Sequence, residues 1–178
     1  MKKEMLKRII RDFHLEVPSK FFERDIEIPM YSGKIISLIG VRRSGKTSLL
    51  FNLIGKLEKE GVERKKVLYL NFEDERLDFK ADELDLILQS YRELYPDLGL
   101  KECYLFFDEI QNVENWERFI RRIYDSVTKN IFITGSNSKF LSTDIATSLR
   151  GRTLCYEVFP LSFKEYLRFN NVSIDLYS

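Results

Sequence analysis

At 178 residues the chain is long enough for one domain with a substantial core, and its apolar fraction of 44% with fourteen Phe excludes an intrinsically disordered chain. The 29 Lys and Arg nearly balance the 28 Asp and Glu, so the net charge of +1 gives no general attraction toward nucleic acid. No apolar run approaches the roughly 18 residues of a membrane-spanning helix, and the charged N-terminus does not resemble a signal peptide. Cys103 and Cys155 lie in apolar runs without metal-ligand spacing, so we expect reduced core cysteines in a cytoplasmic protein.

The first predicted element is an amphipathic helix over residues 4–13, which we expect to dock on the core of its own chain rather than on a partner or a membrane surface. His14 follows it, is the only histidine, and has no partner that the sequence reveals. Ile26, Ile28 and Met30 then alternate with polar residues. With a turn at 31–33, this pattern predicts a short edge hairpin.

The most specific pattern is G-x-x-x-x-G-K-[ST] at Gly40–Thr47. An apolar strand is predicted before it at 35–39, and leucines and isoleucines at helical spacing predict a helix after it. The N-terminus of a helix presents unpaired amide N–H groups and a partial positive charge, so this loop is typical of a phosphate-binding site. An ordinary glycine-rich turn is the alternative. The predicted phosphate-binding residues are Gly40, Arg42, Arg43, Ser44, Gly45, Lys46, Thr47 and Ser48, with the backbone amides of the two arginines mattering more than their side chains.

The remainder of the chain alternates strands with helices. Strands are predicted at 66–71, 103–107, 130–134 and 153–159, and helices at 84–94 and 114–127, with a last helix opened by the capping-box pattern of Ser162 and Glu165. Such alternation predicts an α/β fold, a parallel sheet covered by helices on both faces and a ligand site at the carboxyl ends of its strands. The acidic cluster at 71–76 is expected to be a solvated loop.

Two carboxylates directly follow the predicted strand at 103–107. Asp108 is expected to hold Mg²⁺ together with the Thr47 hydroxyl, because hard oxygen ligands suit this ion. Glu109 is expected to orient and deprotonate an attacking water. The alternative is an acidic pair that complements the dipole of the helix at 114–127.

Small polar residues and arginines follow later strands and helices. Ser136 and Asn137 are candidates for contacting the γ-phosphate or the water, and ordinary turn chemistry is the alternative. Either Arg150 or Arg152 is a candidate for stabilising transition-state charge, within the chain or from a neighbouring subunit. Arginines near the C-terminus of a helix also need no special function.

Taken together, these segments resemble the ATPase core of a prokaryotic family of AAA+-superfamily ATPases. The resemblance runs from about Ile35 to Leu167 and rests on five segments: G-V-R-R-S-G-K-T-S-L-L, F-F-D-E-I-Q-N-V-E-N-W-E-R, I-T-G-S-N-S, A-T-S-L-R-G-R-T and P-L-S-F-K-E-Y-L. It implies a P-loop NTPase three-layer sandwich whose mostly parallel five-stranded sheet has the order 5-1-4-3-2. It also implies ATP and Mg²⁺ as cofactors. The functional positions that it implies are Lys46 and Thr47 in Walker A, Asp108 and Glu109 in Walker B, Ser136 or Asn137 as the sensor, and Arg150 and Arg152 in an arginine-bearing segment.

We therefore expect one P-loop ATPase domain over 1–178, with its core at about 24–170. Relatives in that family usually carry a further C-terminal domain of unknown function, which we expect to be absent from this chain. The expected function is Mg²⁺-dependent ATP hydrolysis that drives a conformational change, and the alternative is a nucleotide-gated switch with little turnover. A kinase or GTPase fits less well, because no Asn-Lys-x-Asp segment is present. Assembly into a homo-oligomer stays open, and no helix-turn-helix or zinc pattern supports binding to DNA.

Overall fold

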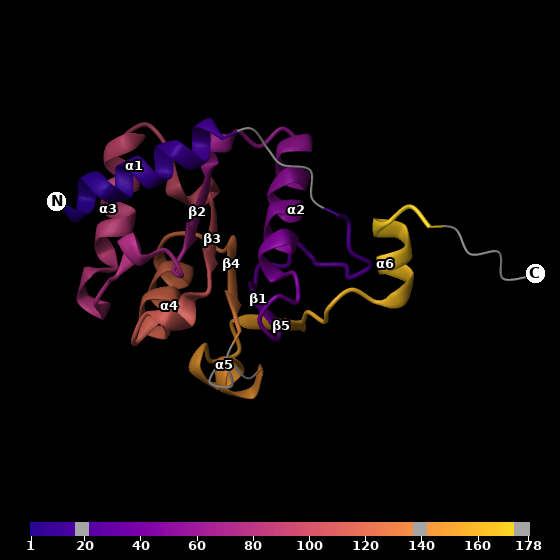
Figure 1. Ribbon diagram of the computed structural model, residues 1–178. Coiled ribbons are helices and arrows are strands. Elements are labelled where there is room, and N and C mark those ends of the chain that lie inside the picture. The colour runs from indigo at the N-terminus through magenta and orange to yellow at the C-terminus, as the bar shows by residue number, and fades with distance from the viewer. Residues whose placement is uncertain (17–21, 137–141, 173–178) are drawn as a thin grey trace, which may run out of the picture.

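The computed structural model describes residues 1–16, 22–136 and 142–172 of the chain (Figure 1). The strands are β1 (Ile35–Ile39), β2 (Val67–Asn71), β3 (Tyr104–Asp108), β4 (Ile131–Gly135) and β5 (Thr153–Glu157). The helices are α1 (Lys2–Leu15), α2 (Lys46–Lys59), α3 (Asp85–Leu94), α4 (Trp116–Ser126), α5 (Ser142–Ser148) and α6 (Phe163–Phe169). Every strand and helix predicted between 35 and 170 is present, with shifts of a few residues at the ends.

The five strands form one parallel sheet in the order β2-β3-β4-β1-β5. Read from the other edge this is 5-1-4-3-2, so the predicted α/β P-loop NTPase fold is confirmed. Because β1 lies between β4 and β5, the loop that follows β1 opens at the carboxyl edge of the sheet beside the end of the central strand β4. Parallel strands bring the ends of β3 and β4 to the same edge.

Side chains that alternate along the strands separate the core into two clusters. Leu68, Leu105 and Ile133 belong to the cluster that α1, α3 and α4 cover, whereas Phe106 and Phe132 belong to the cluster that α2 covers. Figure 1 shows these helices on opposite sides of the sheet, with α6 beyond α2. Strands β1 to β4 are therefore largely buried on both faces, which explains why they read as nearly continuous apolar runs, whereas the edge strand β5 is only partly buried.

The predicted edge hairpin at 26–33 is wrong, because residues 22–34 contain no strand. Ile26, Ile28 and Met30 instead pack, partly buried, against the cluster beneath α2. Pro29 lacks an amide donor, and a segment that lays every second side chain on a helix produces the same alternation as a strand.

His14 has two partners that the sequence did not reveal. Its Nε2 lies 2.7 Å from the Val67 carbonyl oxygen and its Nδ1 lies 2.7 Å from the Tyr95 hydroxyl oxygen. Since a carbonyl only accepts, the neutral ring donates from Nε2 and accepts the Tyr95 hydroxyl at Nδ1. Burial lowers the pKa of His14, and the Arg64 charge lowers it further, against a smaller opposing effect of the Val67 hydrogen bond.

We predict that stability falls as the pH drops from 7.5 to 5.5, because the unfolded chain binds a proton at His14 more readily than the folded chain does. The stability that neutral His14 contributes is present above its ordinary pKa of 6.5 and is lost progressively as the pH falls below that value. Urea unfolding of the wild type and of His14→Gln at several pH values measures it. His14 is the only histidine, so an equal pH slope in the two proteins would contradict the prediction.

Within the described residues, no helix combines the length and apolar character needed to cross a bilayer.

Candidate functional site

The loop between β1 and α2 depends on two glycines. A Cβ on Gly40 would lie 2.3 Å from the Val158 carbonyl oxygen, so only glycine allows this close approach. Gly45 has a φ of +95° and precedes the first residue of α2. The chain is thus turned sharply from strand to helix, and the first amides of α2 face the carboxyl edge of the sheet.

Lys46 is 3% exposed and folds over this loop. Its Nζ donates to the carbonyl oxygens of Gly40 at 3.1 Å and Val41 at 3.0 Å, and it lies 3.5 Å from Glu109 Oε1. The ammonium is therefore fixed between the loop and the end of β3, where it can attract an anion bound by the amides of the loop.

Ser44 supplies a second sign of a ligand site in the loop. Its hydroxyl is buried, yet it has no hydrogen-bond partner in the part of the chain that the structure describes. Buried polar atoms are nearly always paired, so an unpaired hydroxyl in a glycine-rich loop before a helix N-terminus suits an oxygen of a bound anion. The side chains of Arg42 and Arg43 are exposed, and Arg42 pairs with Glu73 at 3.2 Å. The expectation that these two arginines act through their backbone amides stays a prediction.

Asp108 ends β3 and is fully buried. It accepts hydrogen bonds from the hydroxyls of Thr47 at 2.7 Å, Tyr69 at 2.9 Å and Thr134 at 2.5 Å. Burial raises the pKa of Tyr69, and the Asp108 charge raises it further, so the phenol stays a donor. Among the described residues no cationic side chain forms an ion pair with Asp108. A buried carboxylate beside a threonine hydroxyl, both hard oxygen donors, fits Mg²⁺.

Glu109 lies immediately beyond β3 in the left-handed conformation, with a φ of +52°. This turns its side chain away from that of Asp108 and toward Lys46. Its Oε2 accepts hydrogen bonds from Gln111 Nε2 and Ser136 Oγ, each at 2.6 Å. Its backbone amide donates to Thr134 Oγ1 at 2.8 Å. Glu109 is thus held at the same edge as Lys46 by three neighbouring groups.

The structure therefore brings together Lys46, Thr47, Asp108, Glu109 and Ser136 at one edge of the sheet. Asn137 lies outside the described residues, and Ser48 is the third residue of α2. Sequence reasoning missed three contributing residues: Tyr69, Gln111 and Thr134. Thr134 carried a signal, because it follows a buried apolar run at the end of a predicted strand, as Asp108 does.

Arg150 and Arg152 lie at the opposite edge. The Arg152 carbonyl accepts the amide of Ile35, the first residue of β1, whereas the loop follows the last residue of that strand. At ~3.3 Å per residue, β1 separates the two edges by roughly 13 Å, which is beyond the reach of an arginine side chain. The expectation that either arginine stabilises transition-state charge at the site of its own chain is therefore wrong. Action on the site of a neighbouring subunit stays a prediction.

The two arginines differ in their surroundings. Arg152 pairs with Asp125, with Nε–Oδ1 at 2.9 Å and Nη2–Oδ2 at 3.0 Å. Arg150 is exposed, and within the described residues its side chain has no recorded hydrogen bond or ion pair. Arg150 is therefore the better candidate for contacting another molecule.

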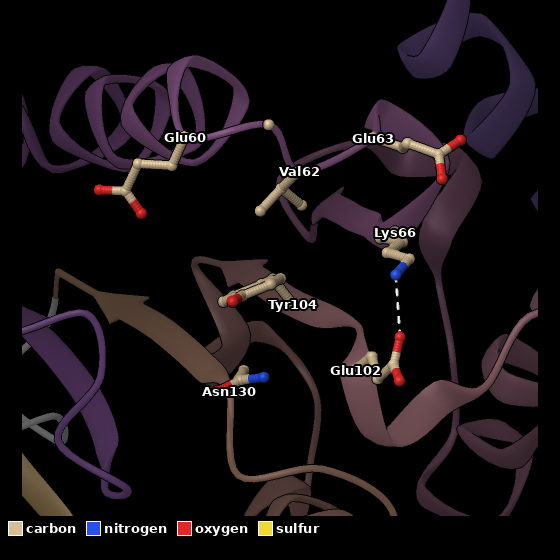
Figure 2. Close-up of a pocket in the computed structure, with 8 residues that line it drawn as sticks. Glu60, Val62, Glu63, Lys66, Glu102, Tyr104 and Asn130 are labelled. Atoms are coloured by element: carbon tan, nitrogen blue, oxygen red, sulfur yellow. Dashed lines mark hydrogen bonds and ion pairs between the residues drawn. The ribbon is translucent and has the colours of Figure 1, made fainter.

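A pocket of about 380 Å³ also lies at the amino edge (Figure 2). Its lining includes Glu60 from the region just beyond α2, Tyr104 from the start of β3, and Lys66, which pairs with Glu102 at 2.8 Å. It is separated from Lys46 and Asp108 by the length of the sheet. This pocket is therefore not part of the site.

The sequence of the chain is similar to a known protein family and to proteins from an archaeon and a bacterium. Residues 32–167 match the model of a family described as an AAA domain. An uncharacterized protein of Methanocaldococcus jannaschii is 48% identical over 177 residues, which are 97% of this chain and 37% of that protein. An uncharacterized protein of Haemophilus influenzae is 40% identical over 139 residues, covering 78% of this chain and 34% of that protein. The chain thus spans little more than a third of the length of these relatives.

Solved structures show only a distant likeness. A DNA polymerase III gamma-subunit-related protein from Thermotoga maritima is 14% identical, with a TM-score of 0.49 over 92% of this chain and 47% of that one. AMPPCP-bound DnaA from Aquifex aeolicus is also 14% identical, with a TM-score of 0.47 over 98% of this chain and 54% of that one.

Proposed function

The chain belongs to the AAA domain family, and from this premise we propose that it is an ATPase core that binds ATP with Mg²⁺, hydrolyses it and couples the nucleotide state to a conformational change. The observation that carries the proposal is the meeting of Lys46, Asp108 and Glu109 at the carboxyl edge of the sheet, beside the N-terminus of α2.

Phosphate binding is assigned to the loop. The amides at the N-terminus of α2 donate to phosphate oxygens, and the Lys46 ammonium exchanges its contacts with the Gly40 and Val41 carbonyls for the β- and γ-phosphates. The Ser44 hydroxyl adds a donor that has no other partner among the described residues.

The divalent ion is assigned to Thr47 and Asp108. When bound, Mg²⁺ neutralises charge that develops on the phosphate oxygens. The hydroxyls of Tyr69 and Thr134 orient the Asp108 carboxylate and remain its donors. This outer set of contacts holds the carboxylate in a fixed orientation.

Glu109 is assigned the role of orienting the attacking water and accepting its proton. Hydrogen bonds from Ser136 and Gln111 hold one carboxylate oxygen, and the other lies 3.5 Å from Lys46 Nζ. These contacts also favour the alternative, a switch with little turnover, because a carboxylate that is already engaged must release a contact before it can take a proton.

Calorimetry tests the proposal. We expect ATP to bind in the presence of Mg²⁺, and Lys46→Ala to weaken binding by roughly 100-fold, since a buried charge-assisted contact is lost. Lys56→Ala is the matched control, because Lys56 lies on the same helix with a half-exposed side chain.

The absence of any binding heat in well-folded wild-type protein would refute the proposed function. Single-turnover hydrolysis then distinguishes the ATPase from the nucleotide-gated switch. Loss of the γ-phosphate within minutes supports an ATPase, whereas retention for hours supports the switch.

A further inference from the structure

Arg24 makes a set of buried contacts outside the cluster of Lys46, Asp108 and Glu109, and its side chain is 8% exposed. All three of its nitrogens donate. Nη1 donates to the Ser44 carbonyl oxygen at 3.0 Å, Nε to Glu165 Oε1 at 2.9 Å, and Nη2 to the Phe159 carbonyl oxygen at 2.7 Å. One guanidinium thus connects the phosphate loop to the segment that leads into α6.

Both carboxylate oxygens of Glu165 accept hydrogen bonds, just as all three nitrogens of Arg24 donate them. Its Oε1 also accepts the Asp25 amide at 2.9 Å, and its Oε2 accepts the Ser162 amide at 2.8 Å as part of the capping box of α6. Burial raises the pKa of the Glu165 carboxyl, but the hydrogen bonds from Arg24 and the two amides outweigh it, and the pKa falls to about 2. The Glu165 carboxyl is therefore ionised at neutral pH.

The hydrogen bond from Arg24 to the Ser44 carbonyl affects the side of the loop on which an anion would bind. The Ser44 carbonyl and the Gly45 amide N–H belong to one planar trans peptide, so they point in opposite directions. Arg24 holds the oxygen and thereby fixes the direction of the N–H, for which no acceptor is recorded among the described residues. A Cβ on Gly45 would lie 2.9 Å from Arg24 Nη1, so the guanidinium packs directly against this peptide.

We propose that Arg24 is a positioning residue for the phosphate loop, and that with Glu165 it links the loop to α6, so that occupancy of the loop changes the stability of α6. The inference rests on the proposed function for the identity of the ligand, but the link itself does not. A phosphate oxygen that draws on the Gly45 N–H polarises the same peptide whose oxygen Arg24 holds. Because either charge left alone in this buried setting is strongly unfavourable, the two residues move together.

Hydrogen–deuterium exchange tests the link without nucleotide. Glu165→Gln touches no atom of the loop, yet we expect it to speed exchange of the amides at 42–47 by at least threefold. Arg24→Lys should speed exchange both there and in α6. Arg168→Ala is the matched control, because Arg168 lies on α6 and pairs with Asp25 at 2.7 Å, but its side chain is 45% exposed. Unchanged loop exchange in Glu165→Gln would overturn the inference, whether or not nucleotide binds.

A second measurement adds Mg²⁺ and ATP. We expect nucleotide to slow exchange at 166–172 in the wild type and in Arg168→Ala, and to have no effect there in Glu165→Gln, whose ATP affinity should fall by about tenfold. Binding without any response of α6 in the wild type overturns the inference but leaves the proposed function standing. No binding in the wild type refutes the proposed function alone.

Glu165→Gln leaves the Arg24 charge buried without its partner, and Arg24→Lys keeps a charge but loses the three-way hydrogen bonding of the guanidinium, so both variants are checked for folding. The double variant Arg24→Gln with Glu165→Gln removes both charges and avoids that cost. We expect it to fold, to bind ATP about tenfold more weakly, and to show no response of α6 to nucleotide. A response equal to that of the wild type would overturn the inference.

Discussion

Replacing Glu109 by glutamine should lower kcat for ATP hydrolysis by roughly 100-fold to 10,000-fold, the range over which a general base contributes. ATP affinity should stay near that of the wild type, because glutamine keeps the size of the side chain and can still accept from Ser136 and Gln111. The contact between Glu109 and Lys46 is long, at 3.5 Å, and the ammonium is held more closely by the carbonyl oxygens of Gly40 and Val41.

The measurement is single-turnover release of the γ-phosphate alongside calorimetric titration of ATP. Glu73→Gln is the control, since Glu73 follows the neighbouring strand β2, is part-exposed and pairs with Arg42. Equal rates in wild type and Glu109→Gln would show that Glu109 is not the base. Loss of binding together with turnover would instead assign it a structural role beside Lys46.

Arg150→Ala should lower kcat by about 1,000-fold in assembled protein while leaving ATP affinity nearly unchanged. An arginine that stabilises charge on the transferring phosphoryl group has an effect of this size. Because Arg150 lies at the edge of the sheet opposite the loop, it can act only on the site of a neighbouring copy. Turnover should therefore depend on protein concentration.

Mixing two inactive variants provides the decisive measurement. Chains with Lys46→Ala retain Arg150, and chains with Arg150→Ala retain the phosphate loop, so their mixture should recover part of the activity. Arg122→Ala serves as the surface control. Wild-type turnover in Arg150→Ala would contradict the assignment, and so would the failure of the mixture to recover any activity. Arg152→Ala, which removes a surface ion pair with Asp125, should change kcat by less than tenfold.

The local elements were predictable because their determinants are local. A buried strand, a glycine-rich loop and a helix at 35–59 follow from apolar spacing and from Gly40 and Gly45, so Lys46 and Thr47 could be placed from the sequence. The position of Asp108 opposite Thr47 needed one further step, the rule that parallel strands end at one edge. The strand order came from the family resemblance rather than from any local pattern.

Contacts that depend on register or on distant segments were not predictable. Tyr69 reaches Asp108 only because β2 pairs with β3 so that Asn71 lies opposite Asp108. Arg24 and Glu165 are 141 positions apart, and each reads as an ordinary surface charge. The edge on which Arg152 lies was predictable, since a residue directly before a predicted strand must lie at its amino end. An arginine at the amino end of this strand cannot reach a ligand at the carboxyl edge of its own sheet.

Asp108 has a consequence for how loss-of-function variants of this chain should be interpreted. Three hydroxyls from α2, β2 and β4 converge on one carboxylate, so Asp108 joins a helix and two strands in addition to its proposed role as a ligand of Mg²⁺. Loss of activity in an Asp108→Ala chain would therefore reflect loss of fold stability as much as loss of a catalytic group. Genetic studies that need a correctly folded but inert protein are better served by Glu109→Gln, because glutamine can still accept the hydrogen bonds from Ser136 and Gln111.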